Sequence, residues 1–328
     1  MQIPAHWAEA RIEGNIGGKK RVIRRFGWSD TSEEDARLLA ERRAAEALRE
    51  LQAGRPIAAR EQKLPYGGEG LPIREQVLAR RGDIVVTRNS YGAHCINVPD
   101  VWFADVDRPP RSELSTAMAT ILVAIAGAVV TALVPGWFGW RVRGCFVLPV
   151  AIANGIILRM LGAHVARRLE NTAWRRNAGV ERLRSALRSV PDSRFAVYET
   201  PNGWRLLALH RTYDPTGAEA QDLLEHVASD PAFAQLCRLQ ACFRARVSGK
   251  PWRMGVRGIR PRPGIWPVHP DRRALREAWI GEYETAAVDF AACRFLEEIG
   301  TAPVHTRCAE VQRIHDELSR ARGSLPIA

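Results

Sequence analysis

The chain has 328 residues and a formal net charge of +12 at pH 7, carried mostly by arginine. This length suits one large or two modest domains beside any membrane segment, and the charge is compatible with nucleic acid or an anionic membrane surface. The six cysteines include no Cys-x-x-Cys pair, which argues against a structural zinc site and indicates reduced, cytoplasmic thiols. The first residues lack a basic patch followed by an apolar core, so we expect no cleaved signal peptide.

A helix is predicted over residues 32–52 in the front part of the chain. Thr31 and Glu34 have the spacing of a capping box, and Gly54 provides the end. Small and aliphatic side chains recur on one face of this segment, while Arg and Glu cover the rest. A second, short helix is expected over residues 72–80, because proline suits a first turn.

Three short strands are predicted next, over residues 83–88, 93–98 and 101–107. They are rich in Ile, Val and aromatic residues and are separated by turn-forming residues, which indicates a meander of adjacent strands. Alternate residues of a strand share a face, so Asp105 and Asp107 point the same way. Two aligned carboxylates at a strand end are a usual way to hold Mg²⁺ or Mn²⁺ against a phosphate, because hard cations prefer oxygen ligands. A strand end that simply surfaces into solvent is the alternative.

An uncharged apolar run follows at residues 114–134. About 20 apolar helical residues cross ~30 Å of hydrocarbon, so this run predicts a transmembrane helix. A weaker apolar run predicts a second span at residues 144–164, and the connection at residues 135–140, with its Pro, Gly and Trp, makes the two a hairpin. A hairpin returns both flanks to one side, and the arginines of the flanks outnumber those of the loop. By the positive-inside rule the soluble parts are expected in the cytoplasm, with the hairpin in a bacterial inner membrane.

The rear part is expected to begin with a basic helix over residues 166–190. Residues 194–200 and 204–210 flank an Asn-Gly turn and give the clearest β-hairpin signal in the chain. His210 ends the second strand on the same face as Trp204, where a structural role competes with a catalytic one. Helices are then expected over residues 218–228, from Asp230 onward, over 272–299 and over 305–322.

A basic tract occupies residues 244–262, where Arg and Lys are interleaved with Pro, Gly and Trp. Such a segment resists regular helix and can present guanidinium groups to phosphates, through paired hydrogen bonds where the geometry fits. A solvated basic loop, or one resting on lipid headgroups, is the competing interpretation. The candidate phosphate-binding residues are Arg205, Arg244, Arg246, Lys250 and Arg253.

The motifs follow one another in a particular order: a strand ending in Asp-x-Asp, a Thr-Pro-x-Gly hairpin whose second strand ends in His, and a basic tract. This order resembles the archaeo-eukaryotic primase-like nucleotidyltransferases. The resemblance implies that Asp105 and Asp107 hold metal and that His210 contacts a nucleotide phosphate in the catalytic site. Separate short segments resemble those of an uncharacterised bacterial membrane protein family: residues 27–30, 87–92, 243–246 and 250–253. This resemblance does not indicate an activity.

Together these elements predict an α+β fold with a discontinuous mixed or antiparallel sheet domain and covering helices, interrupted by an inserted two-helix transmembrane hairpin. Residues 1–112 form the first part of this domain, residues 113–166 the hairpin, and residues 167–328 the second part. The favoured function is a membrane-tethered, metal-dependent nucleotidyltransferase-like activity on a phosphate-containing substrate. Two alternatives stay open: a non-catalytic module that binds anionic lipid headgroups, nucleotide or nucleic acid, and a glycosyltransferase with an Asp-x-Asp metal site. The glycosyltransferase would require a nucleotide-binding βαβ unit, which the sequence does not indicate.

Overall fold

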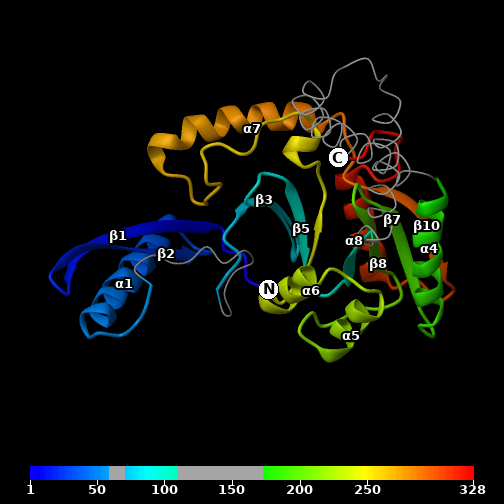
Figure 1. Cartoon of the computed structure of the whole chain (residues 1–328), viewed down its shortest axis with the longest axis horizontal. Coiled ribbons are helices and arrows are strands. Elements are labelled where there is room, and N and C mark those ends of the chain that lie inside the picture. Colours follow the sequence, from blue (N-terminus) through cyan, green and yellow to red (C-terminus); the bar gives the residue numbers. More distant parts are fainter. Residues whose placement is uncertain (59–70, 109–172) are drawn as a thin grey trace, which may run out of the picture. The chain divides into compact units, whose positions relative to one another are not determined.

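The structure, a computed structural model, describes residues 1–58, 71–108 and 173–328 (Figure 1). By its internal contacts the chain divides into two compact units, one of Met1–Asp107 with Ala186–Ala328 and one of Arg108–Ser185. The two spans expected from the apolar runs lie outside the described residues. Within the described ranges, no helix combines the length and the apolar character needed to cross a bilayer.

The first element is a two-stranded antiparallel ribbon that sequence analysis does not predict, made of β1 (His6–Ile16) and β2 (Lys19–Ser29). The predicted first helix is confirmed as α1 (Glu33–Gln52), which lies along this ribbon (Figure 1). Its N-cap is Ser32, whose Oγ accepts a hydrogen bond from the backbone N–H of Asp35 at 3.0 Å. The cap therefore sits one residue later than the predicted capping box, while the helix itself follows the local signals.

Gly27 on β2 lets α1 approach the ribbon closely. A Cβ at this position would lie 2.1 Å from the carbonyl oxygen of Ala36 and 2.3 Å from the nitrogen of Ala40. Because the backbone of a helix cannot yield locally, we expect Gly27→Ala to lower the free energy of unfolding in urea by about 1–3 kcal/mol. Gly281→Ala is the matched control, since nothing lies within 4 Å of its Cβ and alanine favours a helix by up to about 1 kcal/mol. Equal losses in the two variants would contradict the packing argument.

The first four-stranded sheet has the order β3-β4-β5-β9, and every pairing in it is antiparallel. Its strands are β3 (Gln76–Arg81), β4 (Ile84–Arg88), β5 (His94–Val98) and β9 (Phe243–Arg246). The helix predicted over residues 72–80 is wrong, because β3 turns at Gly82, with φ +65°, and pairs with β4. β9 comes from the basic tract, so the beginning of that tract is a strand.

The second four-stranded sheet has the order β10-β7-β8-β6 and is also antiparallel. Its strands are β6 (Phe103–Asp107), β7 (Arg194–Glu199), β8 (Gly203–Ala208) and β10 (Arg294–Gly300). The predicted β7–β8 hairpin is confirmed, but the predicted meander is wrong in its third strand, because β6 pairs with β8 and not with β5. The N–H of Ala208 extends this pairing by donating to the carbonyl of Trp102 at 3.0 Å. Strands from before and after the second unit thus share one sheet, as expected of a discontinuous domain.

The described helices after α1 confirm most of the predicted ones. They are α4 (Ala173–Arg188), α5 (Ala218–His226), α6 (Pro231–Gln240), α7 (Arg273–Ala287) and α8 (Thr306–Ser319), with short 3-10 helices η1 (Pro251–Arg253) and η2 (Pro270–Arg272). The helix predicted over residues 272–299 is too long, because its last part is β10, which pairs with β7. α8 packs on the second sheet, where the His315 ring lies 5.5 Å from that of Phe103 and 4.8 Å from that of Tyr198. The fold is therefore α+β, with antiparallel sheets.

Candidate functional site

Two aspartates at the end of β6 and two cations of a loop near it are termed the Asp/Lys site: Asp105, Asp107, Lys250 and Arg253. Lys250 is near enough to interact electrostatically with the other three. The two aspartates share a face of β6, as strand alternation predicts, and lie opposite Arg205 and Gly203 of β8. Arg253 reaches the β7–β8 turn, where its Nη2 donates to Oδ1 of Asn202 at 2.7 Å. The strand end, the hairpin turn and η1 therefore meet at this site.

Asp105 is held by a buried arginine. Nε of Arg205 donates to Oδ1 of Asp105 at 3.0 Å, and the two side chains are 2% and 41% exposed. Burial lowers the pKa of Arg205, but the charge and hydrogen bond of Asp105 and the nearby Cys293 and Cys95 together raise it above its ordinary value, so the guanidinium stays charged. Nη1 of Arg205 also donates to the carbonyl of Arg246 at 2.6 Å. Arg205, predicted as a phosphate contact, is thus an internal partner of Asp105.

A buried cluster of titratable side chains lies behind Arg205. Nε2 of His315 is 3.4 Å from Nη1 of Arg205 and 3.8 Å from Sγ of Cys293, while its Nδ1 is 3.0 Å from Oδ1 of Asp316. A ring nitrogen that faces a guanidinium must accept, so the proton of a neutral His315 is on Nδ1 and is donated to Asp316. Cys, His and Asp are residue types that catalytic sites use. Here, however, His315 and Cys293 are 0% exposed, so a substrate cannot reach this thiol. The cluster fixes the position of Arg205.

Asp107 and Lys250 have opposed pKa shifts. Partial burial raises the pKa of Asp107, and the negative charges of Asp230 and Asp105 raise it further. Partial burial lowers the pKa of Lys250, as do two neighbouring arginines, while both carboxylates of the Asp/Lys site act the other way. In the described part of the chain, no ion pair within 4.0 Å joins Lys250 to either carboxylate. Lys250 therefore neutralises neither carboxylate by direct contact, whereas Asp105 is paired with Arg205.

The loop that carries Lys250 and Arg253 is anchored on α7. Oγ of Ser248 and the hydroxyl oxygen of Tyr283 are 2.5 Å apart, and the same hydroxyl lies 2.8 Å from the carbonyl of Gly249, to which it donates. Partial burial raises the pKa of Tyr283 to about 12, so this hydroxyl keeps its proton near neutral pH. Hydrogen bonds from a helix thus hold the backbone just before the two cations.

Two further predicted phosphate contacts are engaged inside the protein. Nη2 of Arg244 pairs with Glu75, and the two side chains are 10% and 13% exposed. Nη1 of Arg246 donates to the carbonyl oxygens of Ser248 and Ala328, the latter at 2.9 Å. Of the five predicted cations, Lys250 and Arg253 are therefore the two at the Asp/Lys site, while Arg246 adds its charge from beside it.

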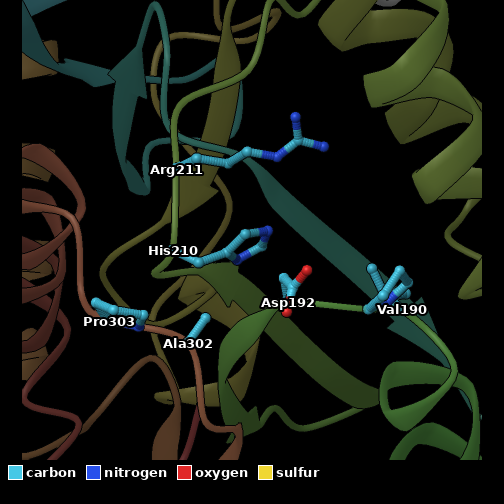
Figure 2. Close-up of a pocket in the computed structure, with 7 residues that line it drawn as sticks. Val190, Asp192, His210, Arg211, Ala302 and Pro303 are labelled. Carbon is cyan, nitrogen blue, oxygen red and sulfur yellow. The ribbon is translucent and has the colours of Figure 1, made fainter.

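His210 lies beyond the far end of β8 from the Asp/Lys site. It lies two residues past the end of β8, whose other end, at Gly203, pairs with Asp107. Its Nε2 is 2.9 Å from the hydroxyl of Tyr213 and its Nδ1 is 3.1 Å from the carbonyl of Arg194. Partial burial lowers its pKa. It lines an open cavity of about 580 Å³ with Val190, Pro191, Asp192, Arg211, Ala302 and Pro303 (Figure 2). The structure therefore does not bring this predicted catalytic residue to the predicted metal ligands.

One carboxylate near the Asp/Lys site is not among the site residues predicted from the sequence. Asp230 caps α6, and its N–H donates to the carbonyl of Asp105 at 2.9 Å, which adds a third carboxylate nearby. In the described ranges, however, no group of three or more His, Cys, Asp or Glu side chains is placed to hold a metal ion. A cation between Asp105 and Asp107 would need oxygen ligands from water or a substrate. No protein-family model, curated protein or solved structure matches the chain.

Proposed function

We propose that the Asp/Lys site binds a phosphate group of its substrate together with Mg²⁺ or Mn²⁺, as part of a membrane-tethered, nucleotidyltransferase-like enzyme. The observation that carries the proposal is the placement of Lys250 near Asp105 and Asp107, on an anchored loop. From the same loop Arg253 reaches Asn202, next to Gly203, the partner of Asp107 on β8. Two cations suit phosphate oxygens, and two carboxylates suit a hard cation. The tether rests on the uncharged run at residues 114–134, outside the described residues.

The donor set fits a cation that is shared with a substrate. Arg205 donates to Oδ1 of Asp105, which leaves Oδ2 as a further acceptor on a carboxylate that is 41% exposed. Asp107 is exposed, and partial burial together with the charges of Asp230 and Asp105 raises its pKa. Mg²⁺ in proteins commonly takes one or two carboxylates and completes its coordination with water and substrate phosphates. When bound, such a cation neutralises phosphate charge, while Lys250 and Arg253 orient the phosphate oxygens.

The test is Mn²⁺ binding to the full chain by calorimetry, with and without inorganic tripolyphosphate. Asp107→Asn is the informative variant, because Asp105→Asn would leave the buried charge of Arg205 without its partner. We expect Asp107→Asn to weaken Mn²⁺ binding by about tenfold or more. Because the pKa of Asp107 is raised, protons should compete for it, so wild-type affinity for Mn²⁺ should fall as the pH is lowered. The control is Asp222→Asn, at an exposed carboxylate on α5; equal Mn²⁺ affinity of the two variants would overturn the proposal.

A second candidate, a non-catalytic module for phosphate-bearing ligands, is favoured by one observation. Arg205 already neutralises Asp105, which lessens the pull of this carboxylate on a cation. The affinity of such a module for tripolyphosphate would be unchanged by EDTA and by the Asp107→Asn substitution. The Lys250→Met substitution would abolish this binding. For the glycosyltransferase alternative there is no supporting observation, since every pairing of named strands in the described residues is antiparallel.

A further inference from the structure

Trp252 is a large aromatic side chain displayed at the surface. It is 58% exposed, whereas the other tryptophans whose exposure the structure describes are buried or half-buried. Trp102, Trp204 and Trp279, by comparison, are at most 4% exposed. A single exposed apolar residue is ordinary in itself, so its neighbours decide whether it has a role.

The Trp252 ring is fixed from two sides. Its centroid lies 5.5 Å from that of Tyr91, with the two planes 59° apart, and Nζ of Lys250 lies 5.6 Å from its centroid. The backbone is fixed too, because the N–H of Arg253 donates to the carbonyl of Lys250 at 2.9 Å and that of Met254 to the carbonyl of Pro251 at 3.1 Å. An aromatic surface that is already ordered loses little conformational entropy when a flat ligand stacks on it.

The cations on either side of Trp252 in the chain belong to the Asp/Lys site. Lys250 lies in the field of Asp105 and Asp107, and Arg253 is bonded to the hairpin turn. If a ligand binds these cations through a phosphate, Trp252 therefore lies close enough for a flat ring of the same ligand to stack on it. A nucleotide has this composition, with a phosphate and a base joined through one sugar.

We propose that Trp252 is a stacking surface for the base of a nucleotide whose phosphates occupy the Asp/Lys site. This inference rests on the proposed function and names the class of substrate. Every base has a π-face, so the stacking discriminates little among bases, and the ligand is a nucleotide or a nucleotide unit of a single strand. An exposed tryptophan also suits a membrane interface. Here, however, Asp105 and Asp107 lie near Lys250, and Asp230 lies near Asp107. These carboxylates would repel an anionic lipid surface, whereas a nucleotide with a bound metal ion uses such carboxylates.

The test compares ATP with inorganic tripolyphosphate, both with Mn²⁺, on the full chain. Wild type is expected to bind ATP about tenfold more tightly than tripolyphosphate, since stacking of one base accounts for a factor of this size. Trp252→Ala should lose this preference for ATP and keep its affinity for tripolyphosphate, and Trp252→Phe should retain most of the preference. Leu275→Ala, at another exposed apolar side chain on α7, is the control and should change neither affinity.

Each contrary result has a distinct meaning. Equal wild-type affinities for ATP and tripolyphosphate, or a Trp252→Ala variant weakened equally toward both, would overturn the stacking role and leave the phosphate site standing. Binding of neither ligand by wild type would overturn the proposed function and this inference with it. A third arm uses vesicles of phosphatidylserine and phosphatidylcholine. If Trp252→Ala weakens vesicle binding and leaves ATP binding unchanged, Trp252 is a membrane contact and the inference is wrong.

Discussion

Replacing Glu75 with glutamine is expected to lower the free energy of unfolding by about 3–5 kcal/mol, because it removes the partner of an enclosed positive charge. The side chains of Glu75 and Arg244 are only 13% and 10% exposed. Burial lowers the pKa of Arg244, but Glu75 and the nearby Cys95 and Cys242 together raise it above its ordinary value. Arginine is not deprotonated in proteins, so the guanidinium stays charged in the variant and loses its partner. The same carboxylate oxygen accepts from Oγ1 of Thr87 at 2.7 Å, and Thr87 in turn accepts from Asn97 at 3.0 Å. One substitution therefore disturbs a network that spans β4, β5 and β9.

Urea-induced unfolding followed by circular dichroism measures this loss. Glu34→Gln is the matched control, because Glu34 and its partner Arg37 are 61% and 53% exposed and such a pair contributes less than about 1 kcal/mol. A double variant that replaces both members of the buried pair with apolar residues, Glu75→Leu with Arg244→Met, should regain most of the lost stability. Losses for Glu75→Gln and Glu34→Gln that agree within about 1 kcal/mol would contradict the argument.

The elements that follow from local signals are those that sequence analysis predicts. α1 begins at a Ser cap, α6 begins at Asp230 followed by proline, and the β7–β8 turn contains Asn202 and Gly203. Caps and turns depend on residues a few positions apart, so a sequence window contains the whole cause. The errors, in contrast, concern pairing. β6 is a strand as predicted, but its partner β8 lies about a hundred residues later, and nothing local distinguishes that partner from β5.

In the candidate site, too, local signals predict some residue positions and tertiary packing decides the others. Strand alternation correctly places Asp105 and Asp107 on one face of β6. His210 lies two residues past the end of β8, at the opposite end from Gly203, which pairs with Asp107. The order of motifs along the chain, on which the primase-like resemblance rests, does not show at which end of a strand each residue lies. Which cations reach the aspartates depends on tertiary packing, which brings Lys250 to the site and encloses Arg205. Exposed and enclosed arginines look the same in a sequence.

Arg205→Met is expected to lower the free energy of unfolding by about 3 kcal/mol, because one guanidinium makes polar contacts with three elements. It bonds Asp105 on β6, the carbonyl of Arg246 on β9 and the ring of His315 on α8. Methionine fills much of the same volume but leaves these acceptors without their donor. Asp105 is 41% exposed and regains water, which keeps the loss near the lower end of the range for a buried pair.

Two comparisons separate this bridging role of Arg205 from a simple loss of charge. Arg205→Lys keeps the charge but lacks the planar fork that reaches the carboxylate, the carbonyl and the imidazole together, so it should recover less than half of the loss. Arg194→Met removes an arginine of the same sheet that pairs with Glu298 at 2.6 Å, where the two side chains are 33% and 28% exposed, and should cost less than about 1 kcal/mol. If Arg205→Lys is as stable as wild type, charge alone accounts for Arg205. If Arg205→Met is no worse than Arg194→Met, the hydrogen bonds to β6, β9 and α8 contribute little, and the second sheet is held to its neighbours by apolar packing.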